Sequence, residues 1–188
     1  MIRYKILTTL LLIQLLAGCI VAVVAGAAAG VIVYDRRSLM VMENDIRIFH
    51  KINTAIETDP RFHNSHIVII SFNHVVLLTG ETLNTKLRIL AEKIAQQQPD
   101  VRRVYNEIKI GYPITLEQQT KDTVITGKVR SSMLAAKGLE SGSIRIVTEN
   151  NIVYLMGIVT TDQANLAVAV ARQIAGVKQV MKVFQYIK

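Results

Sequence analysis

Apolar residues follow two different spacings between residues 45 and 110. One set lies three or four positions apart, as on one face of a helix: Ile46, Phe49, Ile52 and Ile56. Residues 67–72 and 75–80 are short apolar runs typical of paired strands. A second helical face contains Leu87, Leu90, Ala91, Ile94 and Ala95, and alternation at Val104, Asn106 and Ile108 predicts a final strand. The predicted order is helix, strand, strand, helix, strand.

The same order occurs a second time. Aligning Asp45 with Asp122 keeps the two copies in register, with an offset of 77 residues that becomes 76 after the second strand. The second copy has strands at 144–149 and 152–157, and later apolar positions at Leu166, Ala167, Val170, Ala171, Val180 and Phe184. Two copies are too few for a solenoid, which needs at least three stacked units. The pattern therefore predicts a duplicated small domain.

The predicted fold class is α+β, with two tandem αββαβ domains at residues 45–113 and 122–188, joined by a linker at 114–121. In each domain two helices flank a hairpin in sequence, so we expect a three-stranded mixed sheet covered on one face by both helices. Units of this size are marginally stable alone, and packing the two copies together would stabilise both.

Turn residues and glycines recur at equivalent positions in the two copies. Asn73-His74 and Asn150-Asn151 separate the paired strands, and asparagine tolerates the positive φ that a tight hairpin turn requires. Gly80 and Gly157 occupy equivalent positions in the repeat. A structural role, either a close approach of two backbones or a sharp bend, explains such a strand glycine better than a ligand does.

The first 33 residues have a different character. Arg3 and Lys5 precede an apolar run that ends at Cys19, the only cysteine, after small residues. This arrangement resembles the lipobox of bacterial lipoproteins, in which the cysteine receives diacylglycerol and the preceding signal peptide, here residues 1–18, is removed. Residues 19–44 would then be a lipidated cysteine and an apolar tether rich in Ala, Gly and Val. The alternative is an uncleaved signal anchor, since residues 6–33 carry no charge and are long enough to span a membrane.

Composition restricts the chemistry of the chain. A net charge of +8 favours an anionic partner, and the export signal together with the absence of nucleic-acid-binding motifs argues against nucleic acid. A single cysteine permits no intramolecular disulfide. The four histidines, His50, His63, His66 and His74, lack the spacing of a metal site, and no motif of a catalytic or cofactor site occurs. We therefore expect no enzyme activity, no small-molecule substrate, no metal and no cofactor other than lipid on Cys19.

The most informative surface prediction concerns residues 123–137, read as one helix with two stripes. Ile125, Val129, Met133 and Ala136 should face the sheet of their own copy. A second stripe contains Val124, Gly127, Ser131 and Leu134, and is bordered by Lys128, Arg130 and Lys137. A weakly apolar strip with basic edges is typical of a helix that lies in a membrane interface. The alternative is that this strip packs against the first copy.

Net charge points to the same copy. Residues 122–188 contain eight Lys and Arg against four Asp and Glu, whereas residues 45–113 contain nine against seven. Each basic residue near an anionic membrane contributes about 1 kcal/mol of attraction. The second copy is therefore the better candidate for contact with lipid.

Several short motifs, in this order and spacing, resemble the BON-domain family: residues 104–108, 128–131, 148–150, 154–157 and 176–178, which follow the lipobox. The resemblance implies a non-enzymatic lipoprotein of the outer membrane that faces the periplasm. It implies binding of anionic phospholipid through the second BON domain, and support of envelope integrity and of outer-membrane protein assembly. Ile20, directly after Cys19, is not the aspartate that retains lipoproteins in the inner membrane. A module that docks an envelope assembly factor, or an inner-membrane signal-anchored BON protein, is the alternative.

Overall fold

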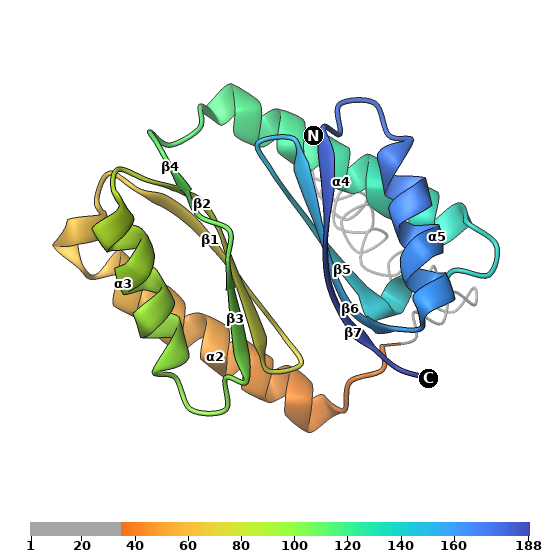
Figure 1. The fold of residues 1–188 in the computed structure, drawn as a ribbon, viewed down its shortest axis with the longest axis horizontal. Coiled ribbons are helices and arrows are strands. Elements are labelled where there is room, and N and C mark those ends of the chain that lie inside the picture. Colours follow the sequence, from red (N-terminus) through yellow and green to blue (C-terminus); the bar gives the residue numbers. More distant parts are fainter. Residues whose placement is uncertain (1–34) are drawn as a thin grey trace, which may run out of the picture. The chain divides into compact units, whose positions relative to one another are not determined.

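The computed structural model describes residues 35–188, which lie in one compact unit. Its first half contains α2 (Leu39–Glu57), the short η1 (Pro60–Phe62), β1 (His66–Phe72), β2 (Val75–Thr82), α3 (Thr85–Gln96), β3 (Arg103–Asn106) and β4 (Lys109–Ile110). Its second half contains α4 (Leu116–Ala135), η2 (Ser141–Ser143), β5 (Ile144–Glu149), β6 (Ile152–Val159), α5 (Thr161–Arg172) and β7 (Gln179–Tyr186). The order helix, strand, strand, helix, strand is thus confirmed in both copies (Figure 1).

Each half contains one mixed sheet with the predicted topology. In the first, β1 and β2 are antiparallel, and β3 and β4 both run parallel to β2. In the second, the order is β5-β6-β7, with an antiparallel and then a parallel pair. Helices α2 and α3 cover one face of the first sheet, and α4 and α5 cover one face of the second (Figure 1). The predicted α+β class is therefore correct.

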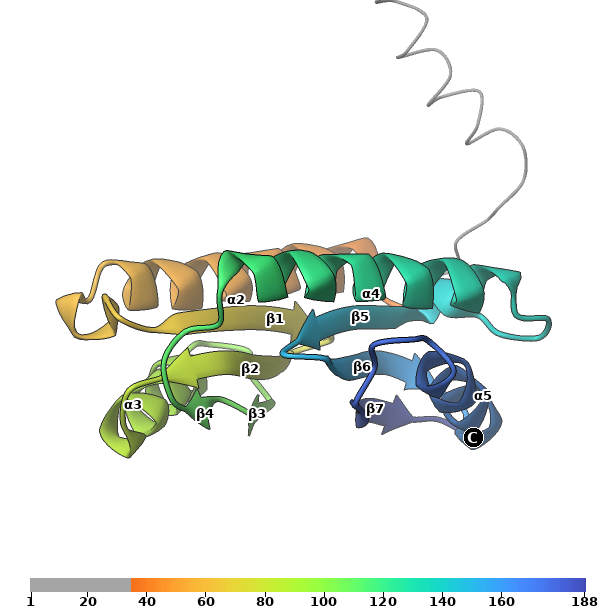
Figure 2. The same cartoon turned by 90° about the horizontal axis from the view of Figure 1, so that it is seen from above.

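The final strand of the first domain is interrupted, whereas a single strand was predicted. Between β3 and β4, the Glu107 amide donates to the Leu78 carbonyl oxygen, and the Ile108 amide donates to Asn106 Oδ1. Ile108 is 1% exposed and packs in the domain core. The regular pairing with β2 is thus interrupted at Ile108 without a change of register, and Figure 2 shows the two short strands separately.

Residues on the two faces of the central strands belong to different cores. In β2, Val76 and Leu78 pack with α2 and α3, while Val75 and Leu77 pack in a separate cluster with the second sheet. That cluster also contains Ile70, Phe72, Tyr154, Met156 and Val183. Burying each such side chain contributes about 1.5–3 kcal/mol. The uninterrupted apolar runs of β2 and β6 therefore reflect burial on both faces.

Two buried aspartates fix the hairpin turns. Asp45 on α2 accepts hydrogen bonds from the backbone amides of Asn73 and His74, at 2.7 and 2.9 Å. Asp122 on α4 accepts the equivalent bonds from Asn150 and Asn151, at 2.7 and 2.8 Å. All four turn residues have positive φ, as the sequence predicts. The two residues that align the repeat thus perform the same structural task.

The two repeat glycines are required by space. A Cβ on Gly80 would lie 2.0 Å from the His66 carbonyl oxygen, and one on Gly157 would lie 2.4 Å from the Ser143 carbonyl oxygen. Both neighbours are backbone atoms and have little freedom to move. Of the two structural roles predicted, the close backbone approach is the one found at both positions.

The first helix of each domain begins earlier than the sequence pattern indicates. Ser38 Oγ accepts from the Val41 amide, so α2 starts at Leu39, inside the tether predicted to reach residue 44. Thr115 caps α4 in the same way, so the helix begins at Leu116, inside the linker predicted at 114–121. The helix predicted at 123–137 also ends earlier, at Ala135. The first turns make no contact with a core, so apolar periodicity begins only where the helix reaches its sheet.

No helix among residues 35–188 has the length and hydropathy needed to cross a membrane. Residues 1–34, which include Cys19, the signal peptide and most of the predicted tether, lie outside the described residues. The predictions made for that segment therefore stay predictions.

Candidate functional site

The two predicted stripes of α4 lie on opposite sides of the helix. Ile125, Val129 and Met133 are 0–5% exposed and belong to the core of the second domain. Ala136, predicted to face the sheet with them, is half-buried and follows the last helical residue. On the other side, Val124 and Leu134 are 51% and 52% exposed. The remaining predicted contact residues, Gly127, Lys128, Arg130, Ser131 and Lys137, are also exposed.

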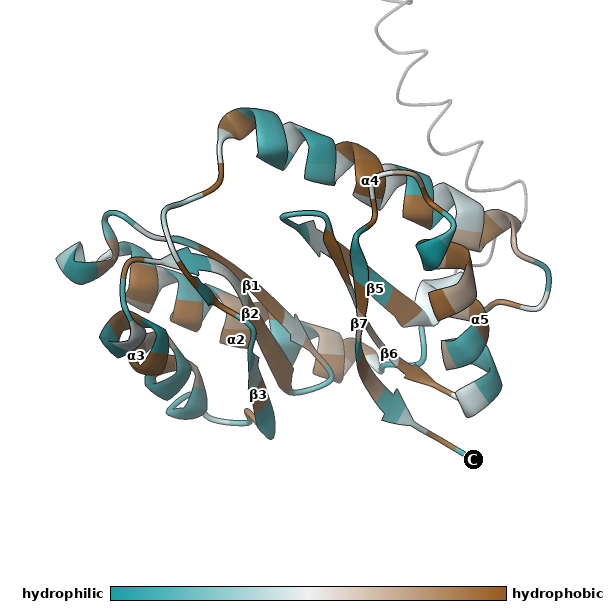
Figure 3. Cartoon of the chain, turned by 45° about the horizontal axis from the view of Figure 1, so that its top comes forward, coloured by the Kyte–Doolittle hydropathy of each residue, from teal (hydrophilic) through white to brown (hydrophobic). Residues whose placement is uncertain are grey.

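The exposed stripe is not packed against the first domain, which was the alternative interpretation. An added Cβ at Gly127 would meet no atom within 4 Å. Within residues 35–188, the structure gives Lys128, Arg130 and Lys137 no hydrogen bond or ion pair. Apolar and polar bands alternate along this helix in Figure 3. The stripe is therefore accessible, and its three flanking cations are available to an anionic partner.

Acidic side chains are absent from the exposed surface of the C-terminal part of α4. Between Thr123 and Lys137 the sequence contains no Asp or Glu. The only exposed carboxylate of the helix, Glu117, lies in its first turn and pairs with Lys121 at 2.7 Å. Burial hides the remaining one, Asp122, beneath the hairpin turn. The positive charge of this part of the helix is therefore not neutralised locally.

Two exposed apolar residues were missed by sequence reasoning because α4 was predicted to begin at residue 123. Leu116 is 79% exposed, and at 100° per residue it has the same angular position as Leu134. Tyr112, four residues before the helix, is 85% exposed. With Leu116 included, the exposed stripe extends over the whole 20-residue helix, about 30 Å. The N-cap residue Thr115, in a Thr-x-x-Gln sequence, was the available signal.

The beginning of the described chain is fastened to the segment that follows α4. Arg36 pairs with Glu140 at 2.6 Å, three residues after Lys137. Next to it, Arg37 is 6% exposed, donates to Asp35 and Asp45, and stacks on the ring of Phe72 at 4.0 Å. The chain therefore enters the described unit beside the C-terminal end of the candidate helix.

The four histidines do not converge. His66 Nε2 lies 3.4 Å from Glu149 Oε2 in the other domain, and this hydrogen bond raises the pKa of His66. His74 is buried in the first hairpin turn, where its Nδ1 lies 3.1 Å from the Asp100 carbonyl oxygen. His50 and His63 are exposed. Within the described part of the chain, no group of three potential ligands is placed to hold a metal ion.

Comparison with known proteins gives two matches to one family model. The model described as the BON domain matches residues 44–112 and again residues 121–188. Over 174 residues the chain is 33% identical to the outer membrane lipoprotein DolP of Haemophilus influenzae, which covers 92% of this chain and 90% of that protein. It is 29% identical over 155 residues to a 21 kDa hemolysin of Actinobacillus pleuropneumoniae, covering 82% of this chain and 80% of that one.

Among solved structures, CdsD, a structural protein of the type III secretion system of Chlamydia trachomatis, has a TM-score of 0.32. The identity is 11%, with 75% of this chain and 92% of that chain covered. A TM-score this low does not establish a shared fold.

Proposed function

This chain belongs to the BON-domain family and is similar over almost its whole length to an outer membrane lipoprotein; from this premise we propose that it is a non-enzymatic, lipid-anchored protein that binds anionic phospholipid with the exposed face of α4. The observation that carries the proposal is the combination of an accessible apolar stripe and three cations without acidic partners on the second domain. Cys19 would carry the lipid, and the domains would face the periplasm from the outer membrane. Support of envelope integrity and of outer-membrane protein assembly completes the proposal.

The geometry of α4 suits an interface helix. Its buried residues hold it on the domain core, so the exposed side is presented without a change of fold. Val124, Leu134 and Leu116 would enter the headgroup boundary, while Lys128, Arg130 and Lys137 would meet phosphates. The chain has no tryptophan, and Tyr112 is the exposed aromatic residue nearest this helix in sequence. Tyrosine is enriched at membrane interfaces, so it would help to anchor the N-terminal end.

The anchor and the helix would reinforce each other. Because Arg36 and Glu140 hold the start of the described unit beside the end of α4, a lipid on Cys19 would keep this helix close to the membrane surface. Linked contacts raise the effective concentration of the second contact once the first is made. The affinity of α4 alone for phospholipid could then be low, and the helix would still stay bound to the membrane that holds the Cys19 anchor.

Charge reversal in the intact two-domain unit tests the proposal. Lys128→Glu with Arg130→Glu replaces two attractions with two repulsions, which should cost a few kcal/mol of binding at ~1 kcal/mol per charge. The protein should begin at Asp35, because Arg37 is a partner of the buried Asp45. Flotation with phosphatidylglycerol vesicles, compared with phosphatidylcholine vesicles, measures the binding.

The matched control reverses two charges in the first domain, Lys51→Glu with Lys86→Glu. Lys51 holds in α2 the repeat position that Lys128 holds in α4, and both control residues are exposed. The control should float like the unaltered protein. If both pairs reduce binding equally, net charge and not the α4 face is responsible. If the α4 variant melts normally and still floats at low salt, the stripe belongs to a protein interface, which is the alternative function.

Lipidation is tested separately in cells. Cys19→Ala should block acylation and processing, and leave a precursor of higher mass in the inner membrane. Metabolic labelling with an alkyne fatty acid should mark the unaltered protein only. An unlabelled protein of unchanged size in the inner membrane would support the signal anchor instead.

A further inference from the structure

Each domain has a groove between its first helix and its first strand, and the two grooves are built from equivalent positions. The groove of about 410 Å³ in the first domain is lined by α2 and β1, and that of about 320 Å³ in the second by α4 and β5. Ile46, Phe49 and Ser71 line the first groove, and their repeat equivalents Thr123, Thr126 and Thr148 line the second. The repeat therefore provides an internal comparison.

The helix side of the first groove has apolar residues at two positions, Ile46 and Phe49, where the second has Thr123 and Thr126. In the second domain, the Thr126 hydroxyl donates to the Thr148 hydroxyl across the groove at 2.7 Å. The fold therefore accommodates polar side chains at these positions. In the first domain the corresponding wall is formed by Phe49 and by Ile46, which is 59% exposed, above Ile69. The second domain folds with Thr123 and Thr126 at these positions, so the apolar side chains of Ile46 and Phe49 are not needed for folding. An exposed apolar wall of this kind is a feature of binding sites.

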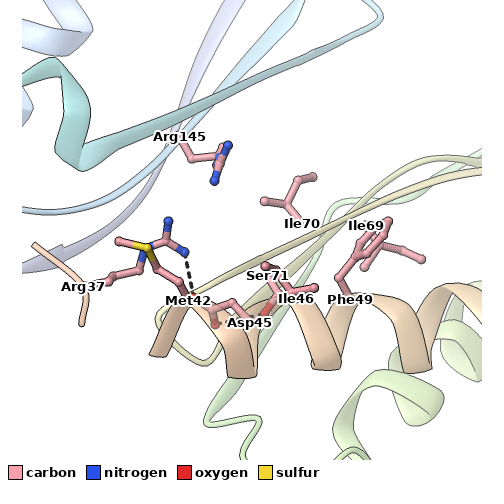
Figure 4. Close-up of a pocket in the computed structure, with 9 residues that line it drawn as sticks. All are labelled: Arg37, Met42, Asp45, Ile46, Phe49, Ile69, Ile70, Ser71 and Arg145. Carbon is pink, nitrogen blue, oxygen red and sulfur yellow. Dashed lines mark hydrogen bonds and ion pairs between the residues drawn. The ribbon is translucent and has the colours of Figure 1, made fainter. Parts of the chain in front are cut away.

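A positively charged side chain, that of Arg145, lies at the mouth of this groove. Arg145 comes from β5 and lies across the groove from α2 (Figure 4). The equivalent position in the other groove is Val68. Within residues 35–188, the structure gives the Arg145 side chain no hydrogen bond or ion pair. The Arg37 guanidinium also lines the groove, but it is already paired with the two carboxylates of Asp35 and Asp45.

The electrostatic surroundings of Arg145 favour an added anion. Although Arg145 is exposed, desolvation by the atoms around its guanidinium lowers its pKa, and the positive charges of Arg37 and Arg130 lower it further. Asp35 and Asp45 act in the opposite direction, but both already accept hydrogen bonds from Arg37. An anionic group at the mouth would meet a guanidinium with donors to spare, and charge-assisted bonds of this kind are stronger than neutral ones.

We propose that the groove between α2 and β1 binds the hydrocarbon chain of a single-chain anionic phospholipid, with the phosphate against Arg145. The chain would lie along Ile46, Phe49 and Ile69. A volume of about 410 Å³ falls within the ordinary range for small-molecule sites and suits part of one chain. This site goes beyond the membrane contact of α4, because it takes a lipid monomer into a groove instead of resting on a bilayer.

Methyl NMR of the unit from Asp35 to Lys188, labelled at isoleucine, tests the proposal. Lysophosphatidylglycerol, added below its micelle concentration, should shift the methyl signals of Ile46 and Ile69 and not that of Ile146, the equivalent of Ile69 in the second groove. Lysophosphatidylcholine should bind about tenfold more weakly, because it carries no net charge. Inorganic phosphate alone should leave these methyl signals in place. A full response to phosphate alone, or shifts centred on Ile146, would overturn the proposal.

Substitutions taken from the second groove provide the decisive variants. Arg145→Val introduces the residue found at the equivalent position and should weaken lysophosphatidylglycerol binding about tenfold. Ile46→Thr, at a half-exposed position, should weaken the binding of both lipids, with Ile69 as reporter. Equal affinity in the unaltered protein and in both variants would disprove the site.

The α4 face provides the control. Val124→Asp with Leu134→Asp should reduce vesicle binding and leave the groove titration unchanged. Loss of vesicle binding with an unchanged groove titration would support both inferences, because it separates the two sites. If the α4 variant abolishes the methyl shifts as well, the lipid binds on α4 and the groove proposal fails.

Discussion

The buried carboxylates of Asp45 and Asp122 show how one residue can determine the geometry of a turn from a distant helix. Each accepts two backbone amides of a hairpin turn that lies 28 or 29 residues away in sequence. Their other partners differ. Asp45 also binds the buried Arg37 at 2.8 Å, whereas Asp122 is met by the Gln118 side chain at 3.0 Å. The duplicated domains therefore share the turn and differ in how its charge is balanced.

Asp122→Ala should lower the free energy of unfolding by about 3 kcal/mol, because two amides of the hairpin turn lose a buried, charged acceptor. Asp45→Ala should cost more, since it also removes one partner of the buried Arg37. Urea unfolding of residues 35–188 measures both. Glu57→Ala, at an exposed carboxylate on α2, is the control and should stay within about 0.5 kcal/mol. If the aspartate variants behave like this control, water replaces the lost acceptors and the turns do not depend on them.

The backbone around Gly80 leaves no space for the methyl group of an alanine side chain. Its φ is +107°, and a Cβ would meet the backbone oxygen of His66 at 2.0 Å. Gly80→Ala should therefore destabilise the first domain by about 3 kcal/mol, through a strained φ and overpacking together. Thermal unfolding provides the measurement. An unchanged midpoint would mean that β1 moves away from β2 without cost.

At the scale of secondary structure, the sequence was informative wherever an element touches a core. The interior face of α4 could be read from Ile125, Val129 and Met133, and the outer stripe followed from the same geometry. Its first two turns could not be read in this way, because Leu116 and its neighbours are exposed and show no helical period. The interruption at Ile108 was also hidden, since the register with β2 is the same on both sides of it and the alternation of apolar residues continues.

Gly127→Ala should have the opposite effect to Gly80→Ala. Gly127 is exposed in the middle of α4, and nothing lies within 4 Å of an added Cβ. Alanine is favoured over glycine inside a helix by about 0.5–1 kcal/mol, so the variant should unfold at higher urea concentration. It should also bind vesicles at least as well as the unaltered protein. A loss of stability would show that this face of α4 packs against part of the chain.

At the scale of the whole molecule, the sequence indicated two domains and their benefit to each other, but not the surfaces that meet. A signal was present, because Val75-Val76-Leu77-Leu78 is apolar on both faces of its strand, which is typical of a strand covered on both sides. Identifying the second cover as the other sheet required the structure, where Leu77 and Tyr154 share one cluster. The ion pair between His66 and Glu149 was likewise invisible, because the two residues are far apart in sequence and belong to different copies.

The pair of His66 and Glu149 makes the contact between the domains sensitive to pH. The hydrogen bond to Glu149 raises the pKa of His66, with smaller help from the charges of Glu149 and Glu81. A histidine whose pKa is higher in the folded state contributes stability that is fully present below its unfolded value of about 6.5 and is lost as pH rises through the folded value. Desolvation and Glu149 raise the pKa of Glu81, so a positive charge on His66 also relieves repulsion between these two carboxylates.

We therefore expect the unit from Asp35 to Lys188 to be more stable at about pH 6 than at about pH 8, where His66 loses its proton. His66→Gln keeps a polar side chain but cannot become charged, so it should flatten this difference. Urea unfolding at the two pH values measures it, and His63→Gln, at an exposed histidine, should keep the pH dependence of the unaltered protein. The raised pKa of Glu81 acts in the same direction, because it also favours the protonated form and hence stability at lower pH. Stability that rises toward pH 8, or a His66→Gln variant with the full difference, would show that this ion pair does not hold the two domains together.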